Sequence, residues 1–131
     1  MREANLYRGK REDTNAWVKG YHVVIGSIDM IVSTDGQFHK IIPETLGQYT
    51  GRHARGRVEI FEGDICQYPD CYSAAGEIEE VVSTGEVKWD EDRPSFYLTN
   101  SLGVEWHTIW EYAYEMTVVG NVHDNPGLLE Y

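Results

Sequence analysis

Apolar and polar residues alternate along this chain in short runs, and turn-forming residues separate the runs. The runs YHVVI (residues 21–25) and IDMIVS (residues 28–33) lie on either side of Gly26-Ser27, an arrangement typical of two strands joined by a tight turn. Asp35-Gly36 follows and precedes QFHKII. This dipeptide predicts a type I′ turn, because both central positions of that turn need positive φ. Two successive hairpins are therefore expected in the first third of the chain.

A second series of short runs begins at FEGDICQY (residues 61–68). EIEEVVS and GEVKW flank Thr84-Gly85, which predicts a turn there, and Pro94 precedes a strand-like run. Val104 and Trp106 alternate as in a strand, whereas Ile109, Tyr112 and Ala113 fit one helical face and predict a short helix or 3₁₀ turn near 108–113. No other segment keeps a helical period, so the pattern predicts a mostly β protein with at most one short helix. An N-terminal β-hairpin lobe (1–60) and a C-terminal β lobe (61–131) are expected, either separate or as one integrated domain.

The amino-acid composition indicates a folded chain whose charge is unevenly distributed along the sequence. Hydrophobic residues make up 41% and aromatic residues 12% of the 131 positions, which excludes disorder. No apolar run is long enough to span a bilayer, and the start lacks the apolar core of a signal peptide, so a cytoplasmic location without membrane binding is expected.

The net charge is −11, with nine basic and seven acidic residues in 1–60 but two basic and fifteen acidic residues in 61–131. This asymmetry indicates two faces with different partners, although acidity also serves solubility.

The segment GRHARGRVEI (residues 51–60) raises the question of phosphate binding. Gly51 and Gly56 have the spacing of a nucleotide-binding loop, but Arg57 and Val58 replace its lysine and hydroxyl residue, and a strand pattern follows. A nucleotide site is therefore excluded. Two interpretations of the basic residues stay open: contacts to nucleic-acid phosphates or a solvated loop. The candidate nucleic-acid-binding residues are Arg52, His53, Arg55 and Arg57.

The acidic half also carries a dense set of aromatic residues. Most of these rings are expected in the core, with one or two exposed on a protein-binding face. The candidate partner-binding residues are Trp89, Asp90, Glu91, Asp92, Trp106 and Trp110. No Ser/His/Asp or Cys/His constellation has motif-level spacing, and Cys66 and Cys71 form no zinc pattern with the histidines. We therefore expect no catalytic residue, cofactor or metal ligand.

Four blocks carry a family resemblance: YRGKREDTNAWVKGY, IPETLGQYTG, IFEGDI and VVGNVHDNPGLLE. In order and spacing they resemble the YopX family of phage and prophage proteins. The resemblance implies a mostly β fold with an SH3-like barrel that begins near the EGD block, and it implies no catalytic residues. The segment GRHARGRVEI departs from the family's acidic, lysine-rich turn. The favoured hypothesis is a non-enzymatic phage or prophage accessory protein in the bacterial cytoplasm, which binds a protein partner or itself. The alternative is a nucleic-acid-binding module that uses the arginine segment.

Overall fold

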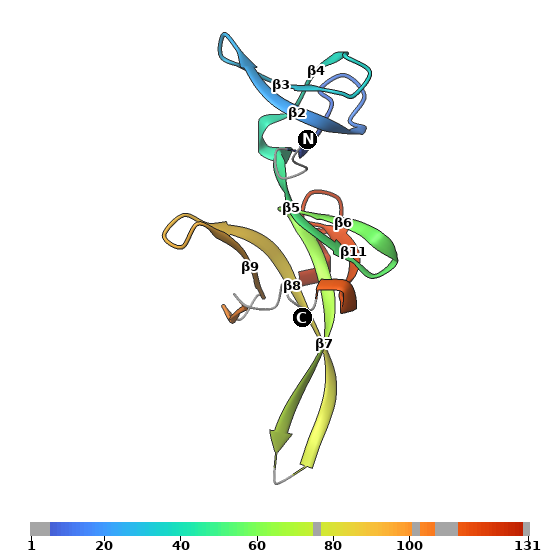
Figure 1. Ribbon diagram of the computed structural model, residues 1–131, viewed down its shortest axis with the longest axis vertical. Coiled ribbons are helices and arrows are strands. Elements are labelled where there is room, and N and C mark those ends of the chain that lie inside the picture. Colours follow the sequence, from blue (N-terminus) through green and yellow to red (C-terminus); the bar gives the residue numbers. More distant parts are fainter. Residues whose placement is uncertain (1–5, 75–76, 101–102, 107–112, 130–131) are drawn as a thin grey trace. The chain divides into compact units, whose positions relative to one another are not determined.

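The computed structural model describes residues 6–74, 77–100, 103–106 and 113–129, and for residues 69–81 and 106 it describes the backbone alone. Figure 1 shows a chain built of β-strands, as the alternating pattern predicts, and the helical segments among the described residues are 3₁₀ turns. The chain divides into two compact units, Met1–Gly51 and Arg52–Tyr131. The hydrophobic pattern of the sequence predicts two lobes with other bounds, 1–60 and 61–131.

The first unit is an antiparallel sheet with the strand order β4-β3-β2-β1-β5, and β5 also neighbours β6. The register of the second and third strands opposes Ile25 to Ile28, so Gly26-Ser27 is the two-residue loop of the predicted hairpin. The strands are β1 (Leu6–Lys10), β2 (Trp17–Ile25), β3 (Ile28–Val32), β4 (Phe38–Lys40), β5 (Gly47–Ala54) and β6 (Val58–Phe61).

The second hairpin differs from its prediction. Gly36 has a φ of +83° but Asp35 does not have positive φ, and the Gly36 N–H donates to the Ser33 carbonyl at 2.9 Å. This is a three-residue loop that ends in a left-handed glycine, so the type I′ prediction is wrong. The carboxylate of Asp35 accepts hydrogen bonds from the Ser33 hydroxyl and the Gln37 N–H. These side-chain bonds stabilise the longer loop, which a dipeptide rule does not consider.

The core of the first unit forms where β1, β2 and β3 approach closely. Ile31, Ile41 and Tyr49 are at most 1% exposed. The block IPETLGQYTG begins with the 3₁₀ turn η2 (Pro43–Thr45) and continues into β5. The hydroxyl of the buried Thr45 donates to the Ile42 carbonyl at 2.6 Å and accepts the Lys10 N–H at 2.8 Å. One side chain therefore ties the end of β1 to the turn that precedes β5.

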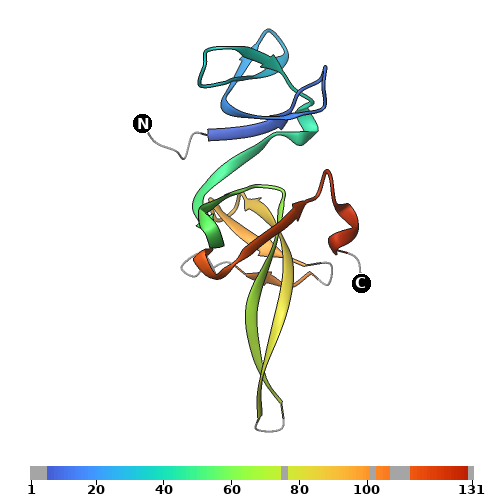
Figure 2. The same ribbon diagram turned by 90° about the vertical axis from the view of Figure 1, so that its right-hand side faces the viewer.

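The second unit is a curled antiparallel sheet with the strand order β10-β9-β8-β7-β11, which Figure 2 shows from the side. This small barrel-like sheet confirms the predicted fold class. Its strands are β7 (Asp64–Ala74), β8 (Glu77–Asp90), β9 (Ser95–Thr99), β10 (Glu105–Trp106) and β11 (Thr117–Asn121), and the 3₁₀ turn η5 (Pro126–Leu129) follows. The sheet encloses a core of buried residues: Ala54, Ile60, Cys66, Tyr68, Val87, Leu98, Ala113 and Met116.

Two boundaries in this part of the chain were predicted wrongly. The expected turn at Thr84-Gly85 is absent, because β8 runs through both residues. A Cβ at Gly85 would lie 3.2 Å from the Thr99 carbonyl oxygen, so the glycine allows β9 to lie close against β8. The segment TLGQYTG predicts a short strand closed by Gly51, but the strand continues to Ala54. The short helix predicted at 108–113 lies outside the described residues except for residue 113. This residue begins a 3₁₀ turn over 113–115.

Candidate functional site

The acidic block FEGDI has a structural role. Gly63 has a φ of +91° in the two-residue connection between β6 and β7. Asp64 is 2% exposed, and its carboxylate accepts the Phe61 N–H at 2.7 Å. The backbone of Gly63 also donates to Val87 and accepts from Val122, each at 2.9 Å. The residue types of this block predict a turn at Gly63 and a buried strand from Ile65. The block also joins three parts of the second unit through its backbone.

The basic turn, which we define as residues 52–57, lies at the end of β5 and the start of β6. Arg52 and His53 belong to β5, whereas Arg55 and Arg57 belong to the 3₁₀ turn η3 (Arg55–Arg57). All four side chains are exposed. Ala54 between them is buried at 2%, and the Arg55 N–H donates to the Met116 carbonyl at 2.8 Å. The turn is thus fixed to the core while its basic side chains face solvent.

Arg57 occupies a backbone position that arginine seldom adopts. Its φ is +62°, and that of the preceding Gly56 is +77°. A left-handed conformation costs an ordinary L-residue about 1 kcal/mol or more, whereas glycine adopts it freely. The backbone conformation at position 57 therefore gives no reason for an arginine there. Residues in such sparsely populated conformations are common at functional sites.

The aromatic–acidic hairpin, which we define as residues 89–96, joins β8 to β9. Trp89 and Phe96 are opposite each other in the register, and their rings meet edge to face at a centroid distance of 4.9 Å and an angle of 67°. Phe96 packs against the core of the second unit. Trp89 remains 39% exposed at the end of β8. A large ring is therefore held in place by a core residue and offers part of its surface to solvent.

The three carboxylates of this hairpin have different roles. The Asp90 side chain accepts the N–H groups of Asp92 and Arg93 at 3.0 and 3.3 Å. Glu91 and Asp92 are exposed. Asp90 therefore holds the turn in shape, and the charge available to a partner lies on Glu91 and Asp92. The sequence predicted all three residues as contacts and did not separate these roles.

The remaining two candidate tryptophans are only partly covered by the structure. The backbone of Trp106 pairs with Leu98 in the ladder between β10 and β9. The side chain of Trp106 and the whole of Trp110 lie outside the described residues. The described part of the predicted partner-binding set is therefore the hairpin with Trp89 at its base.

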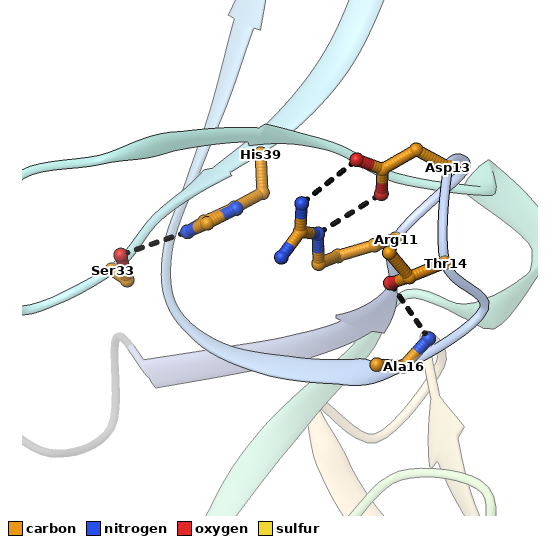
Figure 3. A network of polar contacts seen from close by, with 6 residues as sticks. All are labelled: Arg11, Asp13, Thr14, Ala16, Ser33 and His39. Carbon is orange, nitrogen blue, oxygen red and sulfur yellow. Dashed lines mark hydrogen bonds and ion pairs between the residues drawn. The ribbon is translucent and has the colours of Figure 1, made fainter.

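The first unit contains a polar pocket that sequence reasoning missed. Its volume is about 230 Å³, and its lining residues are Arg11, Glu12, Asp13, Phe38, His39 and Lys40. Figure 3 shows three of these side chains, Arg11, Asp13 and His39. The Arg11 guanidinium donates to both oxygens of Asp13 at 2.8 and 3.0 Å, and this hydrogen bonding holds the pKa of Asp13 below its usual value. Lys40 lies 3.4 Å from Glu12. Because each cation faces its own carboxylate, the pocket braces the loop after β1 and leaves little net charge for a ligand.

Ser33, Asp35 and His39 also come together, although their spacing matches no catalytic motif. The Ser33 hydroxyl lies 3.0 Å from His39 Nε2 and donates its proton to Asp35. This bond lowers the pKa of Asp35 below its usual value. In a nucleophile–base pair the hydroxyl donates to the histidine, and the carboxylate orients the ring. Here the carboxylate accepts the hydrogen bond of the hydroxyl, so the network stabilises the β3–β4 loop rather than orienting the hydroxyl toward the histidine.

Within the described part of the chain, no group of three His, Cys, Asp or Glu side chains is placed to hold a metal ion. Over the same residues, no helix has the length and apolar character needed to cross a bilayer.

Comparison with known proteins supports the resemblance noted in the sequence. The family model described as YopX protein matches residues 6–130. No curated protein matches the chain significantly. The match includes all four blocks, and the described contacts of Thr45 and Asp64 place two of these blocks in structural roles.

Proposed function

Since the chain belongs to the YopX family, we propose that it is a non-catalytic accessory protein of phage or prophage origin in the bacterial cytoplasm, and that it binds a protein partner. The contact surface in this proposal is the aromatic–acidic hairpin. The observation that carries the proposal is the half-exposed Trp89, which is held by Phe96 beside the exposed Glu91 and Asp92.

Tryptophan on a rigid support is the residue type that most often dominates the energy of a protein interface. The side chain supplies a large contact area at a low cost in conformational entropy. Carboxylates around it supply steering and register rather than affinity. Residues 52–131 hold five basic and sixteen acidic residues, so the field of this unit favours a basic partner surface.

The test is affinity capture from the bacterial host with quantification of the co-purified proteins. Trp89→Ser is expected to weaken capture about 30-fold or more, because a central tryptophan contributes more than about 2 kcal/mol. Glu91→Lys/Asp92→Lys is expected to weaken capture of the partner protein and to abolish the salt dependence of that capture. Asp90 is left intact because its loss would disrupt the turn.

A matched control makes the same change in net charge at two other exposed positions, Glu44→Lys/Glu115→Lys. Each variant is first checked for an unchanged far-UV spectrum and melting temperature. Equal capture by wild type, Trp89→Ser and the hairpin charge reversal would refute this surface as the binding site.

The basic turn supports a second candidate function, nucleic-acid binding. The observation in its favour is an exposed arginine held at a φ of +62° that the backbone does not require. Binding would rest on phosphate contacts, so its affinity would fall steeply with salt. Arg55→Ala/Arg57→Ala should then reduce the slope of log K against log salt by about 2. Absence of any shift of DNA or RNA at low salt would eliminate this candidate.

A further inference from the structure

The two candidate surfaces belong to the same compact unit and point away from each other. In Figure 1 the connection between β5 and β6 lies on the right of the second unit, and the connection between β8 and β9 lies on the left. The basic turn of one chain therefore does not reach the aromatic–acidic hairpin of the same chain.

Charge is segregated between these surfaces. Of the five basic residues in 52–131, three are arginines of the basic turn. The other two, Lys88 and Arg93, flank the acidic turn, which still has two more acidic than basic residues over 90–93. The rest of the unit is acidic. A basic surface and an acidic surface on opposite sides of one unit are complementary in charge between copies of the chain.

We propose that the partner of the aromatic–acidic hairpin is the basic turn of a second copy of this chain. The inference rests on the function proposed above and names its binding partner. Association would be head to tail, because the two contacting surfaces differ. Such heterologous contacts close into a ring where the rotation allows it and otherwise extend as an open chain.

The chemistry of the contact has counterparts within the first unit. The Arg8 guanidinium lies over the Trp17 ring at 4.7 Å from its centroid, and Arg11 forms a two-pronged contact with Asp13. In the proposed interface Arg55 and Arg57 would stack on the exposed part of Trp89 and donate to Glu91 and Asp92. Arginine combines both interactions, whereas lysine makes neither as well. Arginine and tryptophan are also the residues most enriched among interface hot spots.

The experiment measures the mass of the whole chain in solution by sedimentation velocity and light scattering, over a range of protein concentrations and at low and high salt. The wild type is expected to exceed the monomer mass of 15.0 kDa at low salt and to approach it at about 0.5 M salt, where the screening length falls to a few ångströms. Arg55→Glu/Arg57→Glu and Glu91→Lys/Asp92→Lys should each weaken association by about tenfold or more, since each replaces two attractive charges by repulsive ones.

The decisive variant combines both reversals in one chain. Its basic turn becomes acidic and its hairpin becomes basic, so head-to-tail pairing regains charge complementarity while the stacking of arginine on Trp89 is not restored. Association should therefore be stronger than in either single reversal and remain weaker than in the wild type. The control Glu44→Lys/Glu115→Lys should associate as the wild type does. Unchanged melting temperatures confirm that every variant is folded.

Two outcomes would overturn the inference: a wild type that stays at 15.0 kDa at all concentrations and low salt, or a combined variant that associates no better than the single reversals. If the wild type is monomeric while Trp89→Ser still abolishes capture of a host protein, the proposed function stands and the second copy is not the partner. If the wild type is monomeric and capture is unaffected, both proposals fail. Binding of DNA or RNA that requires Arg55 and Arg57, by a monomeric wild type, would instead favour the nucleic-acid candidate.

Discussion

Replacing Gly20 by alanine should destabilise the first unit severely. Gly20 is buried in β2, and a Cβ at this position would lie 2.1 Å from the Val32 carbonyl oxygen and 2.7 Å from its carbon. Both atoms belong to the backbone of β3, so no side-chain rotation relieves the overlap. The strands must separate by about 1 Å for the methyl group to reach ordinary contact distance.

The expected cost follows from what this separation disrupts. Tyr21, which follows Gly20, is opposite Val32 in the β2–β3 ladder. Weakening one or two ladder hydrogen bonds costs about 1 kcal/mol each, and overpacking adds about 1–3 kcal/mol. A total of about 2–5 kcal/mol is a large part of the stability of a small domain and corresponds to a fall in melting temperature of about 10 °C or more at the middle of this range.

Two further glycines provide graded controls. At Gly9 the nearest atom to a new Cβ is the terminal methyl of Ile41 at 2.9 Å, which can rotate away. Gly9→Ala should therefore cost about 1 kcal/mol. At Gly127 no atom lies within 4 Å of the new Cβ, so Gly127→Ala should be close to neutral.

The measurement combines thermal unfolding with hydrogen exchange read by mass spectrometry. In Gly20→Ala, peptides from residues 17–32 should lose protection, whereas peptides from the core strands β8 and β9 should keep it if the loss is confined to the first unit. A melting temperature within about 2 °C of the wild type, or equal effects of Gly20→Ala and Gly9→Ala, would refute the reasoning.

Two other substitutions test single polar contacts. Thr45→Val should lower the free energy of unfolding by about 1–3 kcal/mol in denaturant titration, because the Lys10 N–H loses its acceptor, while Thr45→Ser should keep most of the stability. Glu86 tests pH dependence: partial burial, followed by the nearby Glu62, raises the pKa of its carboxyl. The folded state then binds more protons than the unfolded state just above the usual pKa of glutamate, so this group's contribution lowers stability as pH rises through that window. Glu86→Gln should therefore raise the melting temperature at pH 7, with a gain that shrinks as the pH falls below the window. A gain of equal size at both ends of the pH range would contradict the assignment to ionisation.

The fold class was readable from the sequence because its signals are local. Strand alternation depends on neighbouring residues, and the β2–β3 hairpin formed where Gly26-Ser27 interrupts two apolar runs. The buried turn at Gly63-Asp64 was likewise predicted from residue types that favour one backbone geometry. The YopX resemblance also implied a mostly β fold, and the family match over residues 6–130 bears out the resemblance.

The errors arose where contacts outside the turn dipeptide decided the outcome. Thr84-Gly85 has the composition of a turn, but β9 pairs along β8 beside it, and the glycine accommodates that approach. Asp35-Gly36 predicts one turn type, but the hydrogen bonds of the Asp35 side chain to Ser33 and Gln37 accompany a longer loop. Turn propensity is a weak preference that a few tertiary contacts outweigh.

For the candidate sites, the sequence alone identified residue types and the structure decided their roles. Composition located the arginines of the basic turn and the carboxylates near Trp89. Only the folded chain shows that Asp90 caps its own turn, and that the two surfaces lie on opposite sides of one unit. The physical reason is that charge and chemical type are properties of single residues, whereas exposure, capping and direction depend on strand pairings between residues far apart in the chain.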